Sequence, residues 1–153
     1  MIEAKLAELG ITLPAPAAPV ASYVPAVEAG GMLFISGQLP FVDGKVITGK
    51  VGDTRTLAEG QEAAKACATM LIAQMKQALG GDLDRVERIV KLGVFVATTP
   101  EFTEQPEVAN GASDLMEAVF GDAGKHARAA VSVPVLPRDA TVEVDAVVQV
   151  RAV

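Results

Sequence analysis

The most constraining feature of the sequence is an alternation of apolar and polar side chains over residues 141–150, interrupted only at Val147. One face of this segment is formed by Val142, Val144, Ala146, Val148 and Val150. The other face carries Glu143, Asp145 and Gln149, together with Val147. A period of two residues predicts a β-strand with one face in the core. Any fold of this chain must therefore cover one side of a sheet, and the other side must meet water or another subunit.

Two predicted helices can supply that cover. The first spans residues 56–79, where Thr56 and Glu59 have capping-box spacing and two glycines follow the end. Its apolar stripe consists of Ala64, Cys67, Leu71, Met75 and Ala78. The second spans residues 106–120, with Pro106 in the first turn and Gly121 at the end. Its apolar stripe consists of Val108, Ala112, Leu115 and Val119.

The other elements complete an α+β order. Strands are predicted at residues 23–27, 32–36, 86–97 and 128–135, with a small hairpin at 41–47. A short helix at residues 1–10 and a stiff proline-rich connector at 13–19 come first. The turn at residues 136–139 makes the last two strands hairpin neighbours in this prediction. The order predicts an α+β fold, with both main helices on one face of a sheet and one domain over residues 1–153.

Composition excludes several classes of function. The net charge is −6 and the basic residues are scattered, so the sequence offers no electrostatic surface for nucleic acid. One Cys and one His allow neither an intrachain disulfide nor a Cys/His metal site. No apolar run is long enough to cross a membrane, and the first residues do not resemble a secretory signal. We expect a cytoplasmic protein that binds no metal, nucleic acid or membrane.

The familiar catalytic groups are missing from the sequence. Cys67 falls within a helical apolar stripe, which favours a small buried side chain over a nucleophile. His126 could orient a serine, but no GxSxG segment exists for it to serve, so a structural or rim position is favoured. A glycine-rich phosphate loop is also absent. Chemistry must therefore come from other polar groups.

Arg128 and Glu143 are the strongest such candidates. In the predicted hairpin, Arg128, Ala130 and Ser132 share one face of their strand, beside the polar face that carries Glu143. Two interpretations follow. The guanidinium and the carboxylate can form a structural ion pair, which the spacing alone favours. Alternatively, Arg128 can grip a substrate carboxylate while Glu143 handles a proton or a water.

Several segments, taken together and in order, resemble the RidA/YjgF family. They include Ser22-Tyr23-Val24, residues 35–40, Arg85-Val86, residues 91–96 and Phe102. The most specific segments lie at residues 128–133, 136–140 and 142–146, which match an arginine strand, a Leu-Pro turn and a Val-Glu strand. The resemblance covers residues 17–150. Residues 110–113 and 124–128 resemble a longer branch of the family, and residues 1–16 form an N-terminal extension outside its common core.

The resemblance implies a chorismate-mutase-like fold and a homotrimer. The uncovered sheet faces would pack together as a central barrel, with sites in clefts between neighbouring subunits. Active members of the family hydrolyse reactive 2-imino and 2-enamino acids, such as 2-iminobutanoate and 2-iminopropanoate, to 2-oxo acids and ammonia. The chemistry needs no cofactor, since an imine carbon is already electrophilic.

The resemblance also implies roles for individual residues. Arg128 would bind the substrate carboxylate, and Glu143 would position or activate the attacking water. The cleft would be lined by Tyr23, Gly37, Asn110 and Ala130, where Ala130 occupies the position of a frequent family cysteine.

Two other functions remain as alternatives. The same cleft could bind a small carboxylate metabolite without turnover. An endoribonuclease, an activity for which the family is sometimes named, is disfavoured by the net charge of −6.

Overall fold

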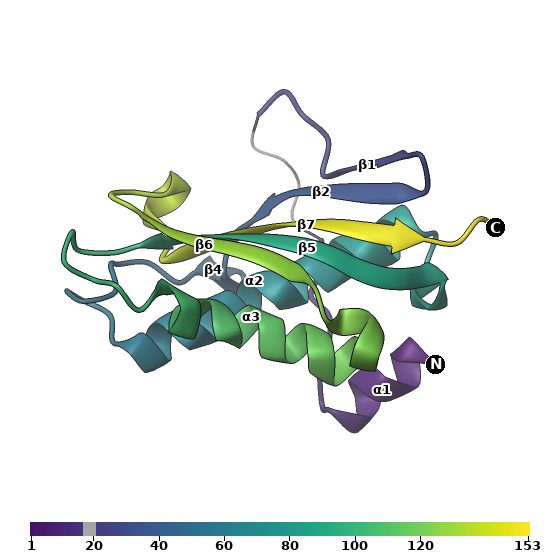
Figure 1. Ribbon diagram of the computed structural model, residues 1–153, viewed down its shortest axis with the longest axis horizontal. Helices are drawn as coiled ribbons and strands as arrows, with labels where there is room; N and C mark the ends of the chain where they lie inside the picture. Colours follow the sequence, from purple (N-terminus) through teal and green to yellow (C-terminus); the bar gives the residue numbers. More distant parts are fainter. Residues whose placement is uncertain (17–20) are drawn as a thin grey trace.

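The computed structural model describes residues 1–16 and 21–153, and its centre is a five-stranded sheet of spatial order β1-β2-β7-β5-β6. The strands are β1 Ala26–Ala29, β2 Met32–Gln38, β5 Val86–Ala97, β6 Ala127–Val133 and β7 Val142–Val150. Helices α2 (Leu57–Ala78) and α3 (Gln105–Phe120) both lie against one face of this sheet (Figure 1). The predicted α+β architecture is confirmed.

The two main helices begin and end where the sequence predicts. At the start of α2, the Thr56 hydroxyl accepts from the Glu59 N–H at 3.1 Å, and the Glu59 carboxylate accepts from the Thr56 N–H at 3.0 Å. In the predicted stripe of α2, Ala64, Cys67, Leu71 and Met75 are buried in the core, whereas Ala78 in the last turn is exposed. The predicted stripe of α3 is buried throughout. Helix α3 ends at Gly121, whose φ of 63° lies in the left-handed region that glycine tolerates.

The predicted hairpin between the last two strands is wrong. Strand β6 pairs with β5 in parallel, whereas β7 pairs with both β5 and β2 in antiparallel register. Strand β5 therefore lies between β6 and β7, and the connection through η3 (Pro137–Asp139) passes over it. The turn residues specify where the chain reverses, but they carry no information on whether another strand fills the gap.

The smaller elements differ little from prediction. The hairpin of β3 (Phe41–Val42) and β4 (Lys45–Val46) and the N-terminal helix α1 (Ile2–Glu8) are both present. Helix α1 buries Leu6 and packs against α3. The first strand begins at Ala26 rather than residue 23. Residues 17–19 of the predicted connector lie outside the described part of the chain.

The two faces of the sheet have different surroundings. The face beneath α2 and α3 is largely apolar and buried, with Leu33, Leu92 and Val144 in the core. On the opposite face, Phe34 and Val131 are 47% and 48% exposed. No helix covers this open face within the described residues, so it is available to another subunit.

Candidate functional site

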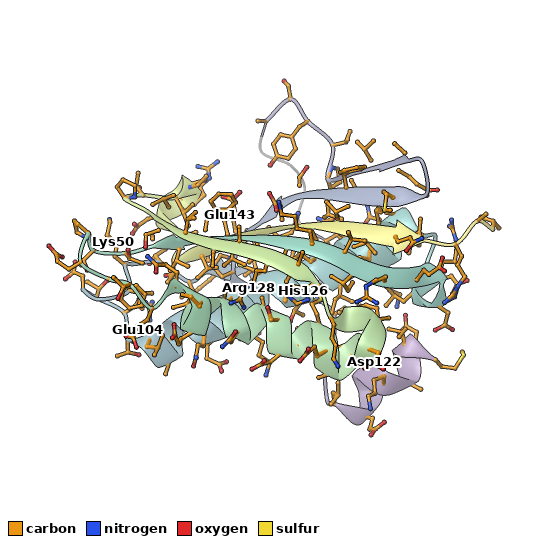
Figure 2. The ribbon with its side chains drawn as sticks, viewed as in Figure 1. Lys50, Glu104, Asp122, His126, Arg128 and Glu143 are labelled. Carbon is orange, nitrogen blue, oxygen red and sulfur yellow. The ribbon has the colours of Figure 1, made fainter. Side chains whose placement is uncertain are left out.

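Arg128 lies at the start of β6 and points toward helix α3 (Figure 2). Its Nη1 donates to Asn110 Oδ1 at 2.9 Å and to Ser113 Oγ at 3.0 Å, and its Nη2 donates to the Pro106 carbonyl at 3.4 Å. Asn110 and Ser113 are one helical turn apart, so they present their polar atoms on the same side of α3. Three contacts from one helix therefore hold the guanidinium.

The hydrogen-bond donors of Arg128 that remain unused are suited to bind an anion. A guanidinium has five N–H donors, of which three are used here. Within residues 1–16 and 21–153, Arg128 has no acidic partner, and its Nε–H and one Nη2 donor make no hydrogen bond. Nε and Nη2 form one edge of the guanidinium, and this edge can bind a carboxylate by two parallel hydrogen bonds.

Ser113 also contacts His126, the residue just before β6. Ser113 Oγ lies 2.8 Å from His126 Nε2, and His126 Nδ1 lies 2.6 Å from the Gly124 carbonyl oxygen. The histidine is therefore a half-buried part of a polar network, consistent with the structural position predicted for it. We call Asn110, Ser113, His126 and Arg128 the Arg128 cluster.

The sequence analysis missed Ser113 as a member of this site. Two signals could have found it. Ser113 follows Asn110 by one helical turn, and His126 precedes Arg128 by two residues, which places both side chains on one side of the strand.

Glu143 lies on the open face of the sheet, above Gly37 on the neighbouring strand (Figure 2). Strand β2 carries a register irregularity between Ile35 and Gln38, which includes Gly37. A Cβ at position 37 would collide with Glu143 Oε2, so glycine leaves the space that the carboxylate occupies. Burial, followed by the nearby Asp145 charge, raises the pKa of Glu143. Such a carboxyl gives up and takes back a proton nearer to neutral pH than an ordinary one.

Asp145 repeats this arrangement one step along β7. Its carboxylate lies over Gly93 of β5, where a Cβ would again collide with it. Burial raises the pKa of Asp145, while the Gly93 N–H and Lys91 act in the opposite direction. Cys67 lies behind this strand, fully buried, with Sγ 3.4 Å from the Val142 carbonyl. This burial confirms the predicted core position of Cys67. Burial and then the Glu143 charge raise the pKa of the Cys67 thiol, which disfavours the reactive thiolate.

Tyr23 belongs to a segment tied to the same end of β2. The Ser36 N–H donates to the Pro25 carbonyl at 2.9 Å, and the Ser36 hydroxyl donates to the Val24 carbonyl at 2.8 Å. Tyr23 itself is 46% exposed. These contacts bring the Tyr23 segment beside Gly37. We call Tyr23, Gly37, Glu143 and Asp145 the Glu143 cluster.

The predicted juxtaposition of Arg128 and Glu143 on one face is wrong within a single chain. Arg128 is registered with Leu92 of β5, and Glu143 with Phe95 of the same strand. Leu92 is buried beneath the helices, whereas Phe95, three residues later, points to the open face. The two side chains are therefore on opposite faces, which excludes the in-chain ion pair. Only two copies of the chain could bring them together.

The remaining predicted site residue is Ala130. It lies two residues after Arg128 on the same side of β6 and packs against the main core. A methyl group there offers no chemistry, so Ala130 can serve only as a wall beside the arginine.

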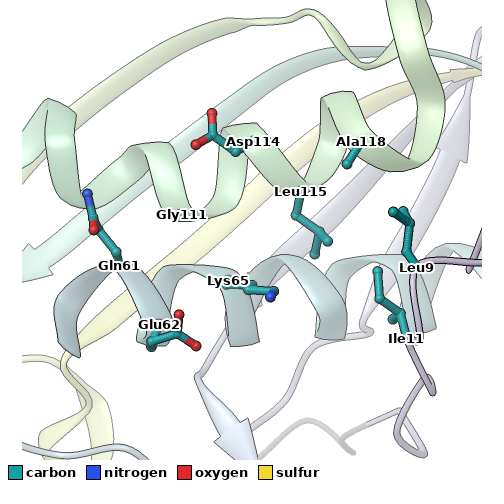
Figure 3. Close-up of a pocket in the computed structure, with 9 residues that line it drawn as sticks. All are labelled: Leu9, Ile11, Gln61, Glu62, Lys65, Gly111, Asp114, Leu115 and Ala118. Carbon is teal, nitrogen blue, oxygen red and sulfur yellow. The ribbon is translucent and has the colours of Figure 1, made fainter. Parts of the chain in front are cut away.

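A groove of about 370 Å³ lies between α2 and α3 on the outer surface of the helix pair (Figure 3). It is lined by Leu9, Ile11, Gln61, Glu62, Lys65, Gly111, Asp114, Leu115 and Ala118. Gly111 and Asp114 are sequence neighbours of the Arg128 cluster, but none of the predicted site residues lines this groove. It is therefore a separate surface feature.

The described residues contain no group of three or more His, Cys, Asp or Glu side chains arranged to hold a metal ion. Among the helices of that same part of the chain, none is long and apolar enough to span a membrane.

Comparison with known proteins places the chain in a family. Residues 3–149 match the family described as "YjgF/chorismate_mutase-like, putative endoribonuclease". Protein TCP17 of Trypanosoma cruzi is 56% identical over 152 residues, 98% of this chain and 94% of that protein. The crystal structure of Atu1372 from Agrobacterium tumefaciens, a protein of unknown function, is 49% identical with a TM-score of 0.92, covering 98% of this chain and 92% of that one.

RidA from the Antarctic bacterium Psychrobacter sp. PAMC 21119 is a more distant structural neighbour. It is 27% identical with a TM-score of 0.61, and the match covers 91% of this chain and 96% of that one. The family model spans nearly the whole chain, and the TCP17 relative covers it almost entirely. The chain therefore belongs to the YjgF/RidA family and has its chorismate-mutase-like fold.

Proposed function

We propose that this protein hydrolyses 2-imino and 2-enamino acids to 2-oxo acids and ammonia, in a cleft between two subunits. The observation that carries the proposal is the state of Arg128. Its guanidinium is held by three hydrogen bonds yet has two free donors and no acidic partner within the described residues. An uncompensated, pre-oriented arginine is suited to bind the planar carboxylate that all these substrates share.

The hydrolysis itself requires one water and three proton transfers. Starting from the protonated imine, Glu143 would accept a proton from water as the oxygen attacks the C=N carbon, giving a neutral tetrahedral carbinolamine. The same carboxyl would return that proton to nitrogen. It would then take the proton of the remaining hydroxyl as the C–N bond breaks, which releases ammonia and the 2-oxo acid. The raised pKa of Glu143 suits a group that must both take and give a proton. Arg128 would supply the positioning.

The placement of the two groups supports a site shared between subunits. Arg128 and Glu143 lie on opposite faces of one sheet, so a second copy must bring its Glu143 cluster to the Arg128 cluster. The open face carries exposed apolar side chains, Phe34 and Val131 among them, that a subunit interface would bury. We propose a homotrimer closed around a threefold axis, the assembly that the family resemblance implies.

The test is hydrolysis of 2-iminopropionate generated in situ, with pyruvate and ammonia followed above the no-enzyme blank. The wild-type protein should exceed the blank, and Arg128→Ala should return to it. Pyruvate binding, measured by calorimetry, should be lost in the same variant. The matched control is Arg151→Ala, because Arg151 also donates to a main-chain carbonyl, that of Asp84 at 2.8 Å, away from both clusters.

The outcomes separate the candidate functions. Pyruvate binding with a rate equal to the blank would replace the enzyme by a carboxylate-binding protein. Unchanged pyruvate binding in Arg128→Ala would remove Arg128 from the site. Ribonuclease activity is the weaker alternative, since a net charge of −6 opposes binding of a polyanion.

The assembly has its own test. Light scattering at micromolar concentration should give three times the mass of the 15.8 kDa chain. A monomer would remove the shared site along with the trimer. The compartment that we expect for this activity is the cytoplasm.

A further inference from the structure

The contacts of His126 define the direction of the hydrogen bonds that Ser113 makes in the Arg128 cluster. The Gly124 carbonyl can only accept, so the His126 Nδ1 that lies 2.6 Å away carries a proton. In the neutral ring, Nε2 is then an acceptor, and the Ser113 hydroxyl 2.8 Å away donates to it. The single Ser113 proton is thereby committed to His126.

This commitment orients the Ser113 oxygen toward Arg128. With its proton on the histidine, Ser113 Oγ offers its lone pairs to the Arg128 Nη1 at 3.0 Å. A serine within a helix otherwise tends to donate to the main-chain carbonyl four residues earlier, here that of Ala109. In that rotamer the oxygen would turn away from the strand. His126 therefore selects the rotamer of Ser113 that holds the guanidinium.

We propose that His126 is a positioning residue for carboxylate recognition. Acting through Ser113, it occupies Nη1 of Arg128 and leaves the edge formed by Nε and Nη2 to the ligand. The specificity that follows is for a planar carboxylate that takes two parallel hydrogen bonds. The identity of the ligand rests on the proposed function. The ordering of the Arg128 side chain does not.

The ordering of the guanidinium can be measured directly. In ¹⁵N-labelled protein, the Nε–H resonance of Arg128 is assigned by its loss in Arg128→Lys. Rotation about the Nε–Cζ bond should be slow in the wild type and faster in His126→Phe and Ser113→Ala. His126→Gln, which keeps an acceptor near the position of Nε2, should recover slow rotation. A histidine that merely held the Gly124 turn would leave this rotation unchanged.

Pyruvate serves as the carboxylate probe in a second measurement. His126→Phe and Ser113→Ala should each weaken pyruvate binding roughly tenfold, the effect of one lost hydrogen bond to a charged group. The double variant should be no weaker than either single one, because the two residues act as a unit. Thr69→Ala is the matched control, since it removes a helical hydroxyl that bonds only within α2.

The results distinguish failure of this proposal from failure of the proposed function. Unchanged rotation and affinity in both His126→Phe and Ser113→Ala would overturn the positioning role. Additive losses in the double variant would also overturn it. If even the wild-type protein fails to bind pyruvate, the proposed function falls, and the Arg128 resonance alone then decides the role of His126. Ser113→Thr, which keeps the hydroxyl, checks the proposal should His126→Phe fold poorly.

Discussion

The Arg128 cluster and the Glu143 cluster are organised by opposite means. In the first, side chains of one helix and one strand are joined by hydrogen bonds, and the charge is held in one place. In the second, Glu143 makes no hydrogen bond or ion pair with the described residues, and two glycines leave room for the carboxylates. In the proposed function, the group that recognises a fixed shape is rigid, whereas the group that changes its charge is left without hydrogen bonds that favour one form.

The largest expected effect is on imine hydrolysis, and it tests the role of the Glu143 cluster. Glu143→Gln keeps size and polarity but removes the proton acceptor. Imine hydrolysis above the blank should fall by roughly 10²–10⁴-fold, while pyruvate affinity stays at the wild-type value. Glu87→Gln, at an exposed position on β5, is the control. Full activity in Glu143→Gln would remove Glu143 from the mechanism, and the Glu143 cluster would then have no catalytic role to set against the Arg128 cluster.

The next effect tests the rigidity of the first cluster. Arg128→Lys keeps the charge but replaces a planar fork by a single ammonium group. Pyruvate affinity should fall by about 10–100-fold, since two parallel hydrogen bonds to a charged group become one. Calorimetry measures the affinity, and light scattering checks that the assembly persists. Equal affinity in the lysine variant would mean that charge alone, and not the fixed geometry, binds the ligand.

Two glycines extend the comparison to stability. At Gly111 of α3, a Cβ would collide with the main-chain carbonyl of Gln61 in α2, and backbone cannot move aside cheaply. Gly111→Ala should therefore cost about 1–3 kcal/mol in the free energy of unfolding. At Gly37 the obstacle is the Glu143 side chain, which can rotate.

Gly37→Ala should consequently cost less than Gly111→Ala in denaturant titrations, yet reduce imine hydrolysis by displacing the carboxylate. If both variants lose stability equally, the space around Glu143 is as tightly packed as the helix interface. The open-face cluster would then not be the looser of the two.

The smallest effect concerns the pH dependence of stability. A carboxyl whose pKa is raised by folding contributes stability below its ordinary pKa of 4.5, and loses it as the pH rises through the folded value. The stability of Glu143→Gln relative to the wild type should therefore increase as the pH rises from 4.5 through the raised pKa of the folded protein. The gain should stay below about 1 kcal/mol, because solvent screens a half-exposed carboxylate.

Chemical denaturation across this pH range, with Glu87→Gln as a flat reference, measures the effect. A relative stability that instead decreases with pH would mean that a cation of another subunit lies beside Glu143. That result would bring the two clusters into contact in the assembly.

The sequence was sufficient for the local structure of this chain. The capping box of Thr56 and Glu59, Gly121 after α3 and the alternation in β7 each act within a few residues, and each predicted its element correctly. The order of strands was not predictable in this way. The pairing of β6 with β5 depends on which surfaces meet across the whole sheet, and no turn residue specifies that.

The same distinction applies to the site. Arg128 and Glu143 are candidates from their positions on the predicted strands, and Asn110 is a candidate from the family resemblance. The placement of the three residues relative to one another comes only from the fold. The parity argument that set Arg128 beside Glu143 assumed adjacent strands, and it failed when β5 was found between them. Parity within one segment was reliable, as the joint approach of His126 and Arg128 to α3 demonstrates.

The position of β7 has a consequence for how the protein is made. It is the last strand of the sequence, yet it occupies the centre of the sheet, between β2 and β5. During synthesis the ribosome delivers two partial sheets, β1-β2 and β5-β6, that have no shared hydrogen bonds until residues 142–150 emerge. Cooperative folding of the sheet must therefore wait until β7 has been synthesised, and a nascent chain stalled before Val142 would expose two unpaired strand edges to aggregation.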